Sequence, residues 1–296
     1  MSNKSNLSIM SNKSKMSKII IHGGFFSESA TNHETKVAKQ QALLRIVKDS
    51  YDYLKTHTAL ETVVHAVSLL EDDELFNAGI GSQIQSDGKI RMSASLMDGS
   101  TMKMSGVINI EEVKNPIQVA EVLFNYDDKV LGGSGATNFA REHGFKQFST
   151  ETPQRRSEYE AKLAATRIGT VGCVALDSDG KIAVATSTGG KGFEIPGRIS
   201  DSATVAGNYA NEFCGVSLTG VGEDIVSGAV AAKIVTRVTD GFPLEKAFEK
   251  TFAELLPFYG FAGAIAIDNK GNIYHQDSHP SMVFASFDGE NEEVFN

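Results

Sequence analysis

The stretch that decides the fold is Ile168-Gly169-Thr170-Val171-Gly172-Cys173-Val174-Ala175-Leu176-Asp177. Residues 170–176 are apolar and rich in β-branched side chains, which predicts a buried strand. The turn Asp177-Ser178-Asp179-Gly180 follows, and residues 181–187 repeat the pattern, so the two strands are expected to form a hairpin. A threonine therefore opens a core strand directly after a glycine.

The segment before this strand differs in composition. Residues 147–166 are polar and charged, contain Pro153, Arg155 and Arg156, and show little apolar periodicity. Such a composition predicts an exposed, flexible linker, which we place over about 147–169. The linker ends where the core strand begins.

The rest of the chain alternates groups of strands with groups of helices. In both halves the order is strands, helices, strands, which favours an α+β fold of two packed sheets covered by helices over a succession of βαβ units. Strands are predicted at 18–21, 90–96, 102–110, 216–219, 262–267, 272–275 and 282–287, and helices at 34–57, 58–70, 116–125, 136–143, 224–238 and 244–258.

The first eighteen residues are polar and lysine-bearing, and they repeat the motif Met-Ser-Asn-Lys-Ser. They predict a disordered tail over 1–18 ahead of a single domain over 19–296, with Met10 or Met16 as alternative starts. No apolar run suits a signal peptide or a membrane span. Cys173 and Cys214 lie in apolar runs that fit buried thiols. We therefore expect a cytoplasmic protein.

Charge and motif content exclude several functions. The formal net charge of -9 leaves no large basic field, so neither nucleic acid nor membrane is an expected partner. The sequence has no phosphate-binding P-loop, no His-Glu-x-x-His zinc motif and no Gly-x-Ser-x-Gly elbow. The glycine cluster at 131–136 either cradles an anion or leads into a helix. His22 follows a strand and is interpreted as a structural hydrogen-bonding residue.

Thr170 can act as a nucleophile only if a base takes its hydroxyl proton. No histidine stands near it in sequence, but the α-amine of an N-terminal threonine, with a pKa of roughly 8, can be that base. This amine is free only if the bond between Gly169 and Thr170 is cut. Glycine tolerates strained backbone geometry, which favours a scissile bond here. The alternative is an ordinary threonine in a core strand.

Four further stretches accompany this junction in order. Together with it they resemble the plant-type L-asparaginase and isoaspartyl peptidase family, which is related to aspartylglucosaminidase and taspase. The resemblance runs from about Ile19 to the C-terminus. The stretches are Leu75-Phe76-Asn77-Ala78-Gly79, Ala185-Thr186-Ser187-Thr188-Gly189-Gly190, Pro196-Gly197-Arg198-Ile199-Ser200-Asp201-Ser202 and Leu218-Thr219-Gly220-Val221-Gly222-Glu223.

The resemblance implies a four-layer αββα sandwich of the N-terminal-nucleophile hydrolase type. It implies self-cleavage into an α-subunit, 1–169, and a β-subunit, 170–296, which pair as a dimer of αβ heterodimers. The implied substrates are β-aspartyl (isoaspartyl) dipeptides and L-asparagine, whose β-amide is hydrolysed to release L-aspartate. No organic cofactor is expected.

The resemblance also assigns catalytic roles. Thr170 is the nucleophile, and Thr188 hydrogen-bonds it. Thr219 and Gly220 bind the oxyanion, and Asn77 assists there; donors aimed at developing charge are catalytic rather than merely binding. A turn after a strand is the alternative explanation of Thr219-Gly220.

Two charged residues match the substrate site. An arginine fork suits an α-carboxylate and an aspartate suits an α-ammonium, so Arg198 and Asp201 would hold the amino-acid head of the substrate and leave its β-carbonyl for Thr170. A surface ion pair is the alternative.

The loop over 70–80 resembles the sodium loop of the family. A hard cation accepts carbonyl oxygens, so a structural sodium ion is implied there. Its ligands would be the main-chain carbonyls of Leu70, Glu71, Asp73, Phe76, Ala78 and Ile80.

The chain departs from the family pattern around the substrate site. Ser200 and Ala203 replace a glycine and a proline on either side of the Asp201-Ser202 pair, and Glu194 stands where a lysine is common, with Lys191 nearby. These changes bear on substrate preference, so two alternatives stay open. One is an aspartylglucosaminidase-like amidase with a sugar amine as leaving group, and the other is a self-cleaving relic that binds amino acids without turnover.

Overall fold

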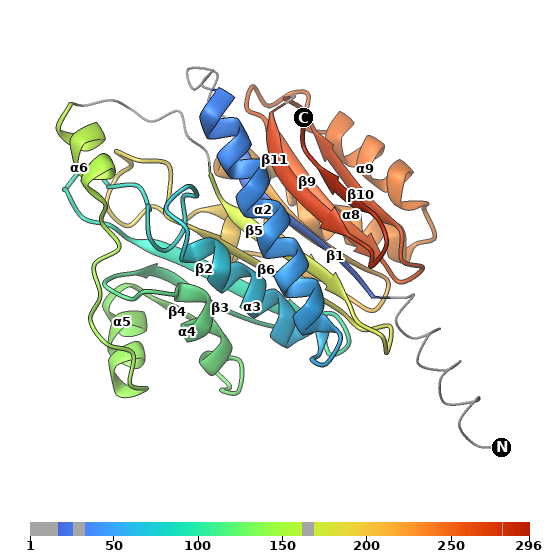
Figure 1. The fold of residues 1–296 in the computed structure, drawn as a ribbon, viewed down its shortest axis with the longest axis horizontal. Helices are drawn as coiled ribbons and strands as arrows, with labels where there is room; N and C mark the ends of the chain where they lie inside the picture. Colours follow the sequence, from blue (N-terminus) through green and yellow to red (C-terminus); the bar gives the residue numbers. More distant parts are fainter. Residues whose placement is uncertain (1–16, 26–32, 162–168, 280) are drawn as a thin grey trace.

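The computed structural model describes residues 17–25, 33–161, 169–279 and 281–296, and it has an α+β fold (Figure 1). The tail predicted over 1–18 lies outside the described residues up to residue 16, and the first strand begins at Lys18. No helix among the described residues is long and apolar enough to cross a membrane.

A large sheet contains the predicted hairpin at its centre. Its strand order is β12-β11-β1-β5-β6-β2-β3-β4. The hairpin is confirmed, because β5 and β6 pair antiparallel and the carboxylate of Asp177 accepts from the N–H groups of Asp179 and Lys181 in the connecting turn. The strands are β1 (Lys18–Phe25), β2 (Met92–Asp98), β3 (Lys103–Ile110), β4 (Val130–Gly132), β5 (Val171–Leu176), β6 (Ile182–Thr188), β11 (Met282–Phe287) and β12 (Glu292–Val294).

A second sheet contains four antiparallel strands in the order β10-β9-β8-β7. Its strands are β7 (Asn208–Ala210), β8 (Cys214–Gly220), β9 (Ala262–Asp268) and β10 (Ile273–Asp277). All residues of β8 and β9 are buried, because one face meets the large sheet and the other is covered by helices. Ile265 and Ile267 belong to the same buried apolar cluster as β5 and β6, so the two sheets share a core.

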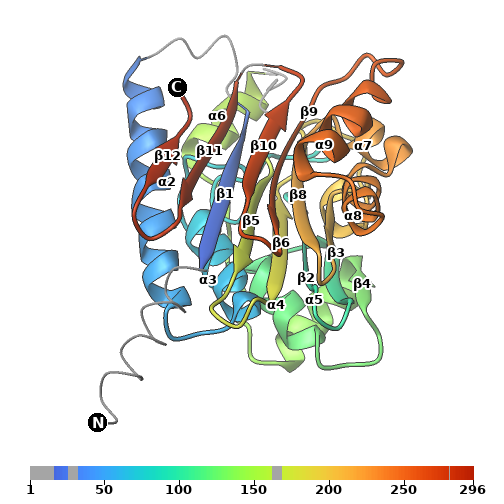
Figure 2. The ribbon, with the colours of Figure 1, turned by 90° about the vertical axis from the view of Figure 1, so that its right-hand side faces the viewer.

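Helices cover the outer faces of both sheets. On the large sheet lie α2 (His33–Leu54), α3 (Ala59–Glu71) and α4 (Pro116–Leu123), and on the small sheet lie α8 (Val230–Thr239) and α9 (Leu244–Ala253). Figure 2 shows α2 at one side of the molecule and α8 and α9 at the other, with the strands between them. A capping box at Thr58 starts α3.

Several local predictions need correction. Part of the expected flexible linker is helical, since α6 (Pro153–Glu160) begins with Thr152 as its cap and its Arg155 donates from Nε to the carbonyl of Gly81 at 2.7 Å. The helix predicted over 224–238 is two helices, α7 (Gly222–Gly228) and α8, because Ala229 adopts a left-handed φ of 49°. Residues 133–142 form α5 (Gly133–Glu142), so the glycine cluster leads into a helix. A 3-10 turn occupies Asp201–Ala203.

The topology brings the ends of three strands together. Antiparallel pairing sets the start of β5 beside the end of β6, with Val171 opposite Ser187. The end of β8, at Gly220, belongs to the sheet that packs on β5 and β6. Residues that the sequence marks for chemistry lie at these ends: Thr170 just before β5, Thr188 as the last residue of β6, and Thr219-Gly220 as the last two residues of β8.

Candidate active site

Thr170 and Thr188 are in contact. Thr170 precedes β5 and is 5% exposed, and its Oγ1 donates to Oγ1 of Thr188 at 3.1 Å. The contact follows from the hairpin, because Thr188 ends β6 one residue beyond the Val171–Ser187 pair. A buried hydroxyl at the Gly169–Thr170 junction is therefore held in one orientation.

Asn77 connects the junction to the turn after β6. Its Nδ2 donates to the carbonyl of Gly190 at 2.6 Å, and the main-chain carbonyl of Asn77 accepts from the N–H of Gly189 at 2.8 Å. The N–H of Gly190 in turn donates to Oγ1 of Thr188 at 3.2 Å. A β-carbon at position 169 would lie 2.7 Å from the β-carbon of Asn77, so only glycine fits there.

Thr219 has a buried hydroxyl without a hydrogen-bond partner among the described residues. Gly220 follows it with a φ of 140°, and a β-carbon there would lie 2.3 Å from the carbonyl oxygen of Phe261. A buried hydroxyl without an acceptor costs free energy, and such a group calls for an explanation. One explanation is an acceptor for this hydroxyl that forms only during a reaction.

Arg198 and Asp201 converge on Gly222. A β-carbon at position 222 would lie 2.7 Å from Oδ1 of Asp201 and 2.9 Å from Nη2 of Arg198, so the absence of a side chain leaves room for both. Asp201 is 2% exposed, its Oδ2 has no partner within the described parts of the chain, and burial raises the pKa of its carboxyl to about 7. The structure thus brings together the two residues predicted to hold the substrate head.

Glu223 is a residue of this site that the sequence reasoning missed. Its carboxylate accepts from Nε of Arg198 at 2.9 Å and from Nη2 at 3.0 Å, and the ammonium of Lys191 reaches the same carboxylate at 2.9 Å. Hydrogen bonds from these cations lower the pKa of Glu223 to about 2. Glu223 stands inside one of the quoted motifs, but a lone glutamate after a glycine gave no signal of its role.

A cavity of about 620 Å³ opens beside these charges. Its lining residues are Lys191, Phe193, Glu194, Ile195, Pro196, Gly197, Arg198 and Glu223. A dipeptide or an amino acid would fit this volume, and Arg198 is part of its wall. Arg198 therefore lies beside a space that can hold a carboxylate ligand, with Nε and Nη2 of its guanidinium bonded to Glu223.

Comparison with known proteins agrees with these positions. A family model described as asparaginase matches residues 15–166 and 149–295. The chain belongs to the asparaginase family. It is 44% identical over 291 residues to the isoaspartyl peptidase/L-asparaginase of Synechocystis, a match that covers 92% of this chain and 88% of the relative.

More distant members of the asparaginase family also match. The isoaspartyl peptidase of Escherichia coli is 37% identical over 282 residues, with 86% of this chain and 88% of that protein covered. The plant-type L-asparaginase of Pyrococcus abyssi is 33% identical over 296 residues, with 91% and 96% covered. The resemblance deduced from the five motifs is therefore confirmed at the level of the family.

The loop after α3 is tightly folded. The N–H of Ile80 donates to the carbonyl of Glu71 at 2.7 Å, and Gly79 has a φ of 52°. A β-carbon at position 79 would lie 2.3 Å from the Glu71 carbonyl oxygen, and one at position 81 would lie 2.9 Å from that of Phe76. The two glycines thus let main-chain carbonyls gather within the loop.

The side chain of Glu71 has a role that the sequence did not suggest. It is fully buried, and its Oε1 accepts from Oγ of Ser187 at 2.6 Å and from the N–H of Ile117 at 3.1 Å. Burial raises its pKa to about 8, so the carboxyl is mostly protonated at neutral pH. The loop is thereby connected to the residue that precedes Thr188.

His22 is a buried structural hydrogen-bonding residue, as predicted. Its Nε2 lies 2.9 Å from Oγ of Ser217, which lies 2.7 Å from Oγ1 of Thr186. These atoms join the two sheets beneath the start of β5. Burial lowers the pKa of His22 to about 3, so the ring is neutral at physiological pH.

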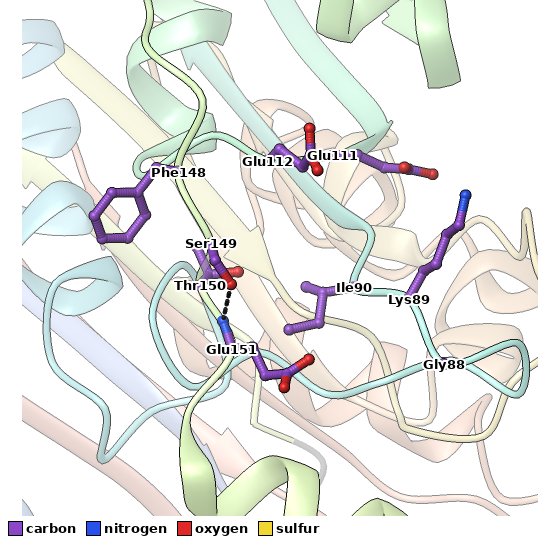
Figure 3. Close-up of a pocket in the computed structure, with 9 residues that line it drawn as sticks. All are labelled: Gly88, Lys89, Ile90, Glu111, Glu112, Phe148, Ser149, Thr150 and Glu151. Carbon is purple, nitrogen blue, oxygen red and sulfur yellow. Dashed lines mark hydrogen bonds between the residues drawn. The ribbon is translucent and has the colours of Figure 1, made fainter.

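A second cavity lies elsewhere and contains none of the predicted site residues. It measures about 210 Å³ and is lined by Gly88, Lys89, Ile90, Glu111, Glu112, Phe148, Ser149, Thr150 and Glu151. Figure 3 shows its side chains, which come from three separate segments, and the bond from the N–H of Glu151 to Oγ of Ser149. We assign it no part in the chemistry.

Proposed function

We propose that the protein cuts itself before Thr170 and then hydrolyses the β-amide of β-aspartyl dipeptides and L-asparagine, releasing L-aspartate. The observation that carries this proposal is the 3.1 Å contact between the hydroxyls of Thr170 and Thr188, directly after a glycine, in a chain of the asparaginase family. Relatives named isoaspartyl peptidase/L-asparaginase support the substrate class.

In self-cleavage, the hydroxyl of Thr170 is the nucleophile and the carbonyl of the preceding residue is its target. Oγ1 attacks the carbonyl carbon of Gly169, the C–N bond breaks, and the nitrogen takes up the proton lost by Oγ1 and becomes the α-amine of Thr170. Water then hydrolyses the resulting ester, which leaves a carboxylate on Gly169 and restores the hydroxyl. Close packing of Gly169 against Asn77 supports a fixed geometry at this bond.

Hydrolysis of the substrate repeats this chemistry on another amide. The new α-amine takes the proton of Oγ1 as it attacks the β-carbonyl, and the leaving amine receives a proton as the C–N bond breaks. The buried hydroxyl of Thr219 donates to the oxyanion, with Gly220 and Asn77 forming the rest of that site. Water then releases L-aspartate and restores the hydroxyl of Thr170.

Substrate binding depends on two opposite charges. The guanidinium of Arg198 donates to the α-carboxylate, and the carboxylate of Asp201 accepts from the α-ammonium. The pKa of Asp201 is about 7 in the free protein because of burial, and an ammonium beside it favours the ionised form. Gly222, between the two side chains, leaves room for the α-carbon that carries both groups.

Three finer features complete the proposal. The order of helices, large sheet, small sheet and helices supports an αββα sandwich of the N-terminal-nucleophile hydrolase type, composed of 1–169 and 170–296 after cleavage. Two such heterodimers associate into a dimer of αβ heterodimers. Two free, buried thiols, Cys173 and Cys214, fit a cytoplasmic location.

A structural sodium ion is also proposed for the loop after α3. The loop residues fit it, because Gly79 and Gly81 leave room beside the Glu71 and Phe76 carbonyls where a β-carbon would intrude. The carbonyls of Leu70, Glu71, Asp73, Phe76, Ala78 and Ile80 would hold the ion. A bound cation would stabilise the loop that contains Asn77.

Mass spectrometry and a turnover assay test the proposal. Denaturing mass spectrometry should give two fragments, one starting at Thr170, and the cleaved protein should hydrolyse β-aspartyl dipeptides and L-asparagine but not α-aspartyl dipeptides. Preference for N-acetylglucosaminyl-asparagine would instead favour an aspartylglucosaminidase-like amidase. Cleaved protein that turns over none of these would favour the binding relic.

Arg198→Lys separates substrate binding from self-cleavage. Lysine keeps the charge but loses the planar pair of donors, so kcat/KM for β-aspartyl dipeptides should fall by about 10–1000-fold. Self-cleavage involves no free substrate and should still occur. Steady-state kinetics on fully cleaved protein measures the effect. Unchanged kcat/KM would make Arg198 part of a surface ion pair.

A further inference from the structure

Arg198 already binds a carboxylate in the free protein, and that carboxylate belongs to the chain. Both oxygens of Glu223 are engaged, one by Nε and the other by Nη2 of the guanidinium, in the two-pronged arrangement that arginine makes with carboxylates. Glu223 and Arg198 line the same cavity. One of the two donor pairs of the guanidinium is therefore occupied by a group of the same chemistry as the α-carboxylate of the proposed substrate.

The position of Asp201 decides whether a substrate could avoid Glu223. The α-carboxylate and α-ammonium of an amino acid are attached to one carbon, so they must bind close together. Nη2 is the Arg198 nitrogen nearest the point beside Gly222 where a β-carbon would lie, and Oδ1 of Asp201 is also within 3 Å of that point. Glu223 holds this nitrogen at 3.0 Å. A zwitterion that binds at this point therefore competes with Glu223 for Nη2.

Lys191 provides a second partner for the displaced carboxylate. Its ammonium lies 2.9 Å from Oε1 of Glu223, and the side chains of Lys191 and Glu223 are each 49% exposed. Glu223 can therefore leave Arg198 without becoming a buried, unpaired charge, which would be costly. The arrangement permits exchange between an internal and an external carboxylate.

We propose that Glu223 is a specificity-determining residue, whose carboxylate mimics the substrate in the free enzyme and is exchanged for the α-carboxylate when substrate binds. This inference rests on the proposed substrate class. A simple carboxylate gains only Arg198 by the exchange, whereas a zwitterion also gains Asp201. Glu223 thus keeps simple carboxylates out at concentrations at which an amino-acid head binds.

The experiment compares Glu223→Gln with the wild type on fully cleaved protein. Because an internal competitor lowers apparent affinity by the fraction of sites it occupies, KM for β-aspartyl dipeptides and the inhibition constant of L-aspartate should both fall by about 3–30-fold. If Glu223 only orients Arg198, both constants should rise. Unchanged constants would also overturn the exchange.

A matched control removes an equal charge elsewhere. Glu249 pairs with Lys246 on α9 at 2.7 Å and is 48% exposed, so Glu249→Gln imitates the charge change away from the cavity. Its constants should equal those of the wild type. A fall as large as that of Glu223→Gln would assign the effect to net charge and overturn the proposal.

Two further measurements keep the outcome decisive. If neither Glu223→Gln nor Glu223→Ala yields folded, cleaved protein, Glu223 is structural and the exchange is refuted. If the wild type hydrolyses no β-aspartyl compound, the proposed function fails, and calorimetric titration with L-aspartate then tests Glu223 alone. Tighter binding to Glu223→Gln than to the wild type supports the exchange, and equal or weaker binding overturns it.

Discussion

Thr170→Ala is expected to remain a single chain of 296 residues and to lose at least about 10⁴-fold in kcat/KM. The variant lacks the oxygen that attacks the Gly169 carbonyl, so no α-amine is released and no nucleophile remains. Among the residues that the structure describes, the Thr170 hydroxyl bonds to Thr188 alone, so the fold should survive its loss. Intact mass under denaturing conditions and a turnover assay measure the two effects.

Thr170→Ser is the matched control, because it removes a methyl group and keeps the hydroxyl. It should still yield two fragments. Appearance of the same two fragments from Thr170→Ala would show that another group, or another protein, cuts the chain.

Thr219→Val is expected to lower kcat by about 10²–10³-fold while leaving the free energy of unfolding within about 1 kcal/mol of the wild type. Valine keeps the shape of threonine and removes the hydroxyl. In the free protein this hydroxyl has no partner among the described residues, so its loss breaks no native hydrogen bond. In the transition state it is the proposed donor to the oxyanion. Kinetics at saturating substrate and denaturant unfolding test both parts.

The opposite pattern is expected for a threonine whose hydroxyl is satisfied. Thr186 is equally buried, and its Oγ1 bonds to Asn208 at 2.9 Å and to Ser217 at 2.7 Å. Thr186→Val should cost about 1–3 kcal/mol of stability, because it removes both of these buried hydrogen bonds. A Thr219→Val protein that unfolds as readily as Thr186→Val, with normal kcat, would contradict the oxyanion role.

The α+β class, the central hairpin and the convergence of the site residues could be predicted from sequence. The alternation of strand-like and helix-like segments and the Asp177–Gly180 turn are local sequence patterns, so they can be recognised without knowledge of the fold. The predicted roles of Thr170, Thr188, Asn77, Arg198 and Asp201 depended instead on five motifs in order. The structure then showed that strand ends bring these motifs together.

What could not be predicted depends on tertiary contacts. Charged residues such as Glu71 and Glu223 look solvated in a sequence, and only the fold buries one and pairs the other with Arg198. The helix α6 was missed because its capping threonine stands within a polar segment. The break at Ala229 was missed because alanine rarely adopts a positive φ.

The strand order has a consequence for the life of the mature protein. In the large sheet β1, from the first part of the chain, lies between β5 and β11 from the second part, and β2 pairs with β6. Cleavage at Gly169–Thr170 would leave two interleaved polypeptides that found this register while they were still one. After unfolding, refolding would require two separate chains to associate, so it would become a second-order, concentration-dependent reaction. Unfolding of the cleaved protein would therefore be effectively irreversible, and its lifetime would depend on its rate of unfolding.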